Sequence, residues 1–282
     1  MNDATYHQGE VTHPVCGGTD IYFPVETRPA EVDGRAVPGY LAVLRSDTGQ
    51  VFGFHRAEYR LVRNAELFPQ FDQALGECGF DLGGMMVSDA IAYGGARTIR
   101  SYRLPSERVE VGVGDPVEFE LRVLNSYDSS VAFSALSAAR RLACLNGMTI
   151  GNSFRLYGRH TKGFGVNDLV GKLKAALTLY RQGTEQFMRW GYRRITDDEA
   201  HTVLCEIPHV NETLLKKLLG YWAKERQSQG NTLWALYNAA TYWATHEGVR
   251  TSSRDNLAAI VLEREARVAR MVDSAEFQRL AA

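Results

Sequence analysis

The stretch DPVEFELRVLNSYDSS, residues 115–130, decides the class of fold. Apolar residues alternate with charged ones in its first half, and this period of two predicts a β-strand over Val117–Leu124 with one buried face and one face in water. The strand is expected to stop at Asn125. The carboxylate of Asp128 can then accept the free backbone N–H groups of a first helical turn, which predicts a helix over Ser129–Cys144. A strand followed directly by a helix indicates an α+β fold.

Further strands are expected on both sides of this stretch. Gly49 supplies the positive φ that closes a hairpin turn, and Gly94-Gly95 predicts a tight bend between two strands. Beyond the central helix, Asn146-Gly147 predicts its C-terminal end. The other elements predicted before residue 161 are strands at Tyr40–Arg45, Gln50–His55, Met85–Ala92, Ala96–Leu104 and Thr149–His160, and a helix around Leu67–Leu75 that ends near Gly76 or Gly79.

The chain divides into three predicted parts. Residues 1–38 are rich in Gly and Pro, which predicts an irregular N-terminal lead-in. Residues 39–194 are expected to form an α+β core in which helices pack on an antiparallel sheet. Residues 195–282 are expected to form an all-helical C-terminal subdomain. A capping box at Thr196 and Glu199 opens this last part, and its further helices are expected at about 210–226, 232–246 and 252–278.

The formal net charge of −1 hides a strong division along the chain. Residues 1–136 hold 11 Lys and Arg against 19 Asp and Glu, and residues 195–282 hold 10 against 12. Residues 137–194 hold 11 against 2, which makes this middle segment strongly basic. Such asymmetry favours a polyanionic partner. The alternative is that the basic middle and the acidic flanks neutralise each other within one molecule or an oligomer.

No established catalytic motif is present in the sequence. It has no P-loop, no GxSxG, no HExxH and no Gly-rich turn placed between a strand and a helix. The 4 cysteines and 7 histidines lack the spacings of zinc ligands, so no catalytic residue, metal or cofactor is predicted and a non-enzymatic function is favoured. The chain opens without a signal-peptide pattern and has no apolar run of membrane-spanning length. We expect a cytoplasmic protein without a membrane partner.

The basic middle segment carries the candidate binding residues. On the predicted strand Thr149–His160, the side chains of Arg155, Tyr157 and Arg159 share one face. Cations gain affinity for phosphates by releasing counterions, and a ring among them can stack on an unpaired base. An ordinary solvated face with one exposed Tyr is the alternative. The candidate nucleic-acid-binding residues are Arg155, Tyr157, Arg159, His160, Lys162, Lys172, Lys174, Arg140 and Arg141.

Several short motifs along the chain resemble a known family. They are Pro38-Gly39-Tyr40, Arg45–Gly49, Gly94-Gly95 with Arg97, Asn125–Ser130, Arg141–Gly147, Gly151-Asn152 and Trp234–Ala239. In this order they resemble the phage- and plasmid-borne family called domain of unknown function 932, over roughly residues 35–275. The resemblance implies an accessory protein of a mobile element without an established activity. The motif residues that it marks as structural or functional are Asn125, Asp128, Asn146, Gly147 and Asn152.

A looser likeness concerns the predicted order of strands followed by a helix that bears Arg140 and Arg141. This order is similar in outline to the core of the single-strand annealing proteins of phages, and the likeness implies a homo-oligomeric ring or filament. Our leading hypothesis is a protein that binds nucleic acid, with single-stranded DNA as the expected ligand, in recombination or replication of a phage or plasmid. One alternative is an effector that binds a host defence or partition protein. Another is an enzyme acting on nucleotides or polynucleotides, built around Asn125, Asp128 and His160.

Overall fold

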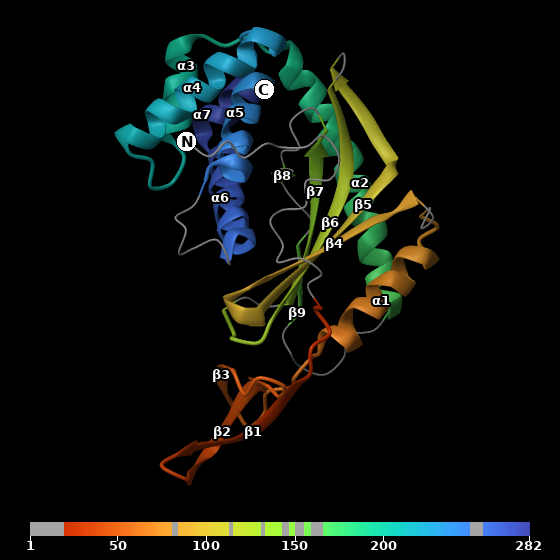
Figure 1. Ribbon diagram of the computed structural model, residues 1–282. Coiled ribbons are helices and arrows are strands. Elements are labelled where there is room, and N and C mark those ends of the chain that lie inside the picture. Colours follow the sequence, from red (N-terminus) through yellow and green to blue (C-terminus); the bar gives the residue numbers. More distant parts are fainter. Residues whose placement is uncertain are drawn as a thin grey trace.

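A small sheet, a large sheet and a set of C-terminal helices follow one another along the chain (Figure 1). The structure, a computed structural model, describes residues 20–80, 84–112, 115–130, 133–142, 147–149, 155–158, 166–248 and 256–282. Its strands are β1 Val25–Val32, β2 Arg35–Arg45, β3 Val51–Arg56, β4 Met86–Ala92, β5 Arg97–Gly112, β6 Asp115–Ser126, β7 Phe133–Arg141, β8 Gly147–Thr149 and β9 Arg155–Gly158. Its α-helices are α1 Asn64–Glu77, α2 Val166–Tyr192, α3 Asp197–Cys205, α4 Glu212–Gln229, α5 Leu233–His246, α6 Leu257–Val272 and α7 Ala275–Ala281. The expected α+β class and the concentration of helices toward the C-terminus are confirmed.

The large sheet is an antiparallel meander in the order β4-β5-β6-β7-β8, and β9 also pairs with β7. Figure 1 shows α1 and α2 on one side of this sheet and the C-terminal helices on the other. The strand predicted over Val117–Leu124 is the centre of β6. Its predicted exposed face is wrong, because both faces of β6 are covered. The sheet is therefore the middle layer of the molecule.

The helix predicted over Ser129–Cys144 is wrong, because this stretch contains strand β7. Strand β7 pairs with β6 on one side and with β8 and β9 on the other. A central strand gains ladder hydrogen bonds along both edges, and this tertiary pairing outweighs the helix propensity of its Ala-rich sequence. Small residues such as Ala135 and Ala139 also suit a strand that is packed tightly. Asp128 consequently caps no helix.

The small sheet has the order β1-β2-β3 and contains the confirmed hairpin around Gly49, whose φ is 73°. Strand β1 and the start of β2 correct the expectation of an irregular lead-in over residues 1–38, although residues 1–19 lie outside the described residues. Asp33 and Gly34 join the two strands with φ values of 52° and 73°. Two successive left-handed residues are typical of the tight turn that matches the twist of a hairpin.

A second correction concerns the strand predicted over Thr149–His160. Two short strands, β8 and β9, occupy the described parts of this stretch, and both pair with β7. Residues 150–154, 159 and 160 lie outside the described residues. The bend expected at Gly94-Gly95 is present as a single 3-10 turn between β4 and β5, with φ values of 67° and 104°.

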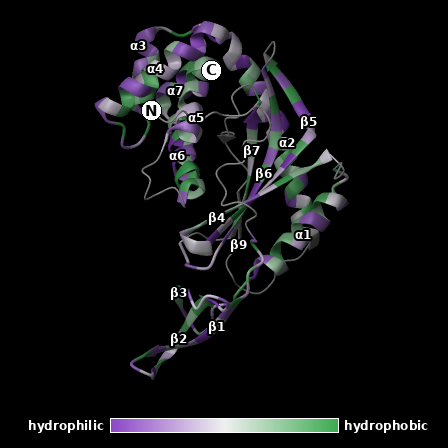
Figure 2. Ribbon diagram, in the orientation of Figure 1, coloured by the Kyte–Doolittle hydropathy of each residue, from purple (hydrophilic) through white to green (hydrophobic). Residues whose placement is uncertain are grey.

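One hydrophobic core extends from the large sheet into the C-terminal helices. On the sheet it contains Phe119 and Leu121 of β6, packed against α1 and the first half of α2. Toward the end of α2 it continues into an aromatic group made by Phe187, Trp190, Trp234, Tyr237 and Phe277, whose neighbouring rings lie about 5–6 Å apart. Helices α3 and α4 carry both hydrophobic and hydrophilic residues, as expected of helices with one buried face (Figure 2).

Helix α3 begins where the predicted capping box places it. Thr196 accepts a hydrogen bond from the backbone N–H of Glu199, and the Glu199 carboxylate accepts one from the backbone N–H of Thr196, which confirms the capping box. The helix expected over residues 252–278 is divided into α6 and α7, because Ser274 caps a new first turn. In the described residues, none of the helices combines the length and the apolar character that a membrane span requires.

Two glycines give a test of this fold with opposite expected signs. An alanine Cβ at Gly95 would lie 2.8 Å from the Phe23 ring at a φ of 104°, so Gly95→Ala should lower the free energy of unfolding by more than about 1 kcal/mol. Gly171 lies exposed in α2 with open space around it, so Gly171→Ala should raise the same quantity by about 0.5–1 kcal/mol. Urea unfolding followed by tryptophan fluorescence measures both. Equal effects of the two substitutions would contradict the described packing of the two sheets.

Candidate nucleic-acid interface

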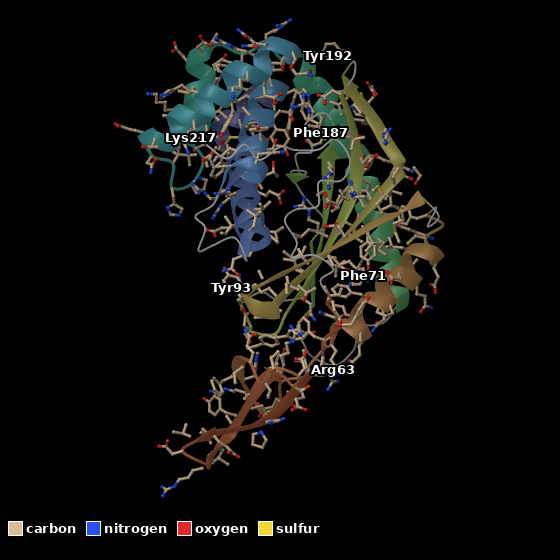
Figure 3. The ribbon with its side chains drawn as sticks, in the orientation of Figure 1. Arg63, Phe71, Tyr93, Phe187, Tyr192 and Lys217 are labelled. Carbon is tan, nitrogen blue, oxygen red and sulfur yellow. The ribbon has the colours of Figure 1, made fainter. Side chains whose placement is uncertain are left out.

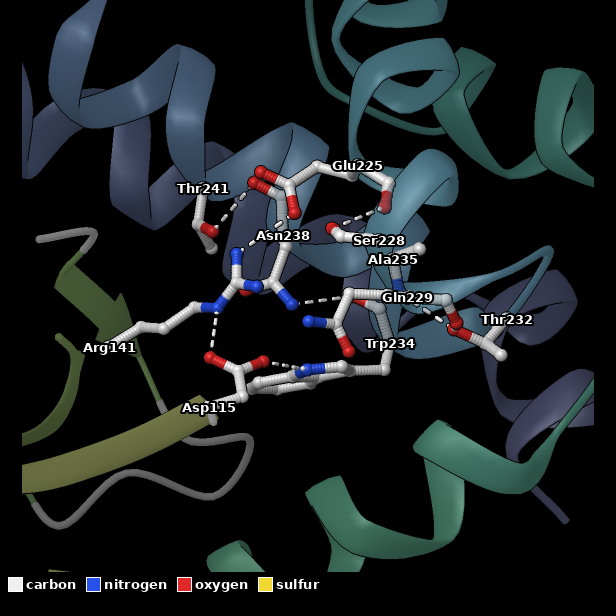
Figure 4. Close-up of polar contacts among 10 residues, drawn as sticks. All are labelled: Asp115, Arg141, Glu225, Ser228, Gln229, Thr232, Trp234, Ala235, Asn238 and Thr241. Carbon is white, nitrogen blue, oxygen red and sulfur yellow. Dashed lines mark hydrogen bonds and ion pairs between the residues drawn. The ribbon is translucent and has the colours of Figure 1, made fainter. Parts of the chain in front are cut away.

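Arg140 and Arg141, at the end of β7, are not surface residues. They are 4% and 3% exposed. Arg141 lies between β6 and α4, where its guanidinium contacts Asp115 at 2.5 Å and Glu225 at 2.9 Å (Figure 4). The indole Nε1–H of Trp234 donates to the other oxygen of Asp115 at 2.7 Å. Two carboxylates therefore neutralise Arg141 inside the protein, and it is unavailable to a phosphate.

Arg140 lies in a buried charge network between the large sheet and α6. The core of this network is Arg122, which donates to Glu120 at 3.1 Å and to Glu265 of α6. Burial lowers the pKa of the Arg140 guanidinium, and burial raises the pKa of Glu265. Among the described residues, Nε of Arg140 has no hydrogen-bond partner. These groups join the sheet to α6, and they do not form an open groove.

The strand residues of the predicted interface are described in part. Arg155 and Tyr157 lie in β9, where their backbones pair with Leu136 and Ser134 of β7. Arg159, His160 and Lys162 lie outside the described residues, as do the motif residues Asn146 and Asn152. Gly147 is the first residue of β8. Nucleic-acid binding by these residues stays a prediction.

The outer face of α2 carries the exposed cations of the basic segment. Lys172 is half-buried, whereas Lys174 is exposed. From Lys174 onward, exposed positions recur every three or four residues, which is the spacing of one helix face. We call this face the α2 stripe. It consists of Lys174, Arg181, Arg189 and Tyr192 of α2, together with Arg193 directly after the helix, and one acidic residue, Glu185, lies among them.

The end of the α2 stripe combines cations with an exposed ring. The side chain of Tyr192 is 89% exposed, and Figure 3 shows it at the end of α2. Arg189 lies one helical turn before it and Arg193 directly after it; both are exposed. Within the described parts of the chain, neither has a carboxylate within ion-pairing distance. Arg189 is therefore open to an anion, whereas the charge of Arg193 also acts on the carboxylate of Glu199 in the first turn of α3.

Arg181, which lies two helical turns before Arg189 on the stripe, differs from Arg189 and Arg193 because it forms an ion pair. Its guanidinium forms an ion pair with Glu107 of β5 at 2.9 Å, although 61% of its side chain is exposed. An ion pair in water contributes little stability, so a phosphate can compete with Glu107 at small cost. Lys174 and Tyr192, the last residue of α2, are 18 residues apart, which on a helix is about 27 Å, and Arg193 extends this line by one residue.

Sequence reasoning did not identify the most exposed cluster of this candidate interface. Residues Arg189–Arg194 read RWGYRR and hold three arginines and a tyrosine in the basic segment. The helical period separates Trp190, which is buried, from Tyr192, which is exposed. A helical projection continued past Arg181 would have identified this cluster.

The motif residue Asn125 and its neighbour Tyr127 attach α1 to the large sheet. Nδ2 of Asn125 donates to the carbonyl of Val62 and to Oδ1 of Asn64, at 3.0 and 2.9 Å. The backbone N–H of Asn64 donates to the Tyr127 hydroxyl at 3.1 Å. Asn64 is 1% exposed, and these bonds satisfy polar groups that would otherwise be costly to bury.

The motif residue Asp128 forms a turn. Its carboxylate accepts from the backbone N–H of Ser130 at 2.9 Å and forms an ion pair with Arg97 at 3.2 Å. Burial acts to raise the pKa of Asp128, but the hydrogen bonds from Ser130 and the charge of Arg97 outweigh it, so the pKa is lowered. Asp128 is therefore an ionised turn residue. The enzyme hypothesis had placed it beside His160, which lies outside the described residues.

A comparison with family models matches residues 51–279 to the family described as Domain of unknown function (DUF932). The chain belongs to this family. The DUF932 region begins at β3, so it includes the large sheet and the helices, whereas β1 and β2 precede it. A search of curated proteins and a search of solved structures found no match. The description of the DUF932 family assigns no function.

The buried position of Arg141 has a measurable consequence. Arg141→Ala leaves Asp115 without its counter-charge in the interior and should lower the free energy of unfolding by about 3–5 kcal/mol. Arg279→Ala removes an exposed ion pair with Glu276 and should cost less than about 1 kcal/mol. Urea unfolding of both variants compares these values. Similar small losses would show that Arg141 is solvated, as an interface residue would be.

Proposed function

We propose that this protein binds single-stranded nucleic acid, with DNA as the first candidate, along the α2 stripe. The observation that carries the proposal is the exposed Tyr192 between Arg189 and Arg193, which have no carboxylate within ion-pairing distance in the described chain. Guanidiniums bind the phosphates, and the ring stacks on an unpaired base. The basic segment reaches solvent here, although its arginines on β7 do not.

A single strand fits this surface better than a duplex does. An exposed tyrosine at the end of a helix offers a flat ring to a base, and only unpaired bases expose their faces. The part of the stripe on α2 is one line of charges about 27 Å long, and such a line follows one phosphate backbone. The biological role proposed with this ligand is that of an accessory protein, in the cytoplasm, for recombination or replication of a mobile element. The most specific version of this role is the annealing of complementary single strands by a homo-oligomer of the protein.

Fluorescence anisotropy with a labelled oligothymidylate tests the proposal. Replacing Arg189 and Arg193 together by alanine should flatten the slope of log affinity against log salt by about 0.7 for each phosphate that is no longer neutralised. Tyr192→Ala should weaken binding by about 1–3 kcal/mol with little change in that slope, because stacking releases no counterions. A competing duplex of the same length should bind more weakly.

The matched control is Arg35→Ala with Lys216→Ala, which removes the same charge from exposed positions on the small sheet and on α4. This control should leave affinity and salt slope close to those of the unaltered protein. Loss of affinity in the control alone, or a salt slope that the Arg189 and Arg193 substitutions leave unchanged, contradicts the α2 stripe. Light scattering with and without the oligonucleotide measures assembly in the same samples.

A further inference from the structure

A hydroxyl and an imidazole meet where the small sheet packs on the large one. Ser129 follows β6, and its Oγ lies 2.9 Å from Nδ1 of His55 on β3. The other ring nitrogen of His55, Nε2, lies 2.9 Å from the backbone carbonyl of Tyr127. His55 is 6% exposed, whereas Ser129 is exposed. A buried base is thus placed behind a solvent-facing hydroxyl.

The contacts of His55 determine which of its nitrogens carries the proton. A carbonyl oxygen can only accept a hydrogen bond, so Nε2 must carry the hydrogen that is donated to Tyr127. In the neutral ring, Nδ1 then has a free lone pair, and it accepts the hydroxyl hydrogen of Ser129. This is the arrangement in which an imidazole acts as general base toward a serine, with a third group that fixes its tautomer.

The backbone around this pair is held in an unusual conformation. Ser129 has a φ of 59°, in the left-handed region that non-glycine residues rarely adopt. On the other side of the contact, Gly53 of β3 allows the close approach, because a Cβ there would lie 3.3 Å from Cα of Asp128 and 3.4 Å from Nε2 of His55. The ring of His55 also stacks on Tyr59 at 3.9 Å, which fixes its plane.

At the turn that contains Ser129, the negative charge of Asp128 is balanced by the positive charge of Arg97. The neighbouring carboxylate, Asp128, would repel the oxyanion that forms when a hydroxyl attacks a carbonyl. Arg97 forms an ion pair with it and also lies over the ring of Tyr93 at 4.2 Å. With Arg97 occupied in this way, the turn offers no spare positive charge from this residue to a phosphate. A neutral electrophile suits the site better than a phosphodiester does.

We propose that Ser129 is a nucleophile toward neutral acyl compounds, namely esters or thioesters, with His55 as its general base. Ser129 Oγ forms a bond to the acyl carbon while its proton moves to Nδ1 of His55. The bond from the acyl carbon to the leaving oxygen or sulfur breaks, and that atom takes the proton from His55. Water then attacks the acyl-serine, His55 removes a proton from the water, and this proton returns to Oγ as the acid departs. This site is separate from the α2 stripe.

A fluorophosphonate probe, which modifies activated serines, tests the proposal on the full-length protein. Ser129 should be labelled, as shown by peptide mapping with mass spectrometry, and p-nitrophenyl acetate should leave an acetyl group on the same residue. His55→Gln should slow labelling by about 100-fold or more, the usual contribution of a general base. Ser46→Ala, which alters an exposed turn serine that has no described imidazole partner, should be labelled like the unaltered protein.

Ser129→Ala and Ser129→Gly should both abolish labelling. Glycine adopts the left-handed conformation without strain, so the second variant separates loss of the hydroxyl from loss of the turn. Circular dichroism melting confirms that each variant is folded. Labelling that persists in Ser129→Gly, or a folded unaltered protein that takes up no probe and no acetyl group, overturns the proposal. Neither result bears on oligonucleotide binding.

Discussion

Strand β6 is buried on both faces, although charged residues occupy alternate positions along its centre. Moving an ion into the interior costs several kcal/mol, which is recovered only where a counter-charge and further hydrogen bonds meet it. Glu118 and Glu120 lie opposite Arg140 and Arg103 on the neighbouring strands. Arg122 reaches Glu265, 143 residues later in the chain. The sheet therefore requires α6 as its covering layer, and the C-terminal helices cannot be an independent addition to it.

This requirement also explains what the sequence could and could not predict. The period of two along β6 predicts a strand correctly, and the capping box of Thr196 and Glu199 marks the start of α3. An exposed face was the natural inference for Glu118, Glu120 and Arg122, because charges usually face water. Glu265, the partner of Arg122 on α6, is too distant in sequence for local patterns to reveal it. The helix predicted where β7 lies was wrong for the same reason. The conformation of β7 depends on pairing with neighbouring strands, which its Ala-rich composition does not reveal.

The basic middle segment shows that net charge along a chain is not a surface property. On β7, Arg141 is enclosed with Asp115 and Glu225, and it holds the sheet to α4. On α2 and directly after it, Arg189 and Arg193 face solvent. The difference follows from layer position: β7 is an inner strand of the middle layer, whereas α2 has one face against the sheet and one face outside. A helix face therefore supplies exposed cations, whereas the two arginines of β7 lie in the interior.

The turn after β6 shows how one motif can carry two kinds of role. Asn125 and Tyr127 bond to the start of α1, and this part of the motif is structural. Ser129 is different, because glycine would occupy its left-handed backbone without strain, whereas for other residues a sparsely populated conformation costs about 1–3 kcal/mol. Because a serine at this position costs backbone energy that glycine would avoid, the contacts of its hydroxyl should explain its presence. Its described contact is the acceptor nitrogen of His55, a residue 74 positions earlier that no sequence spacing connects with it.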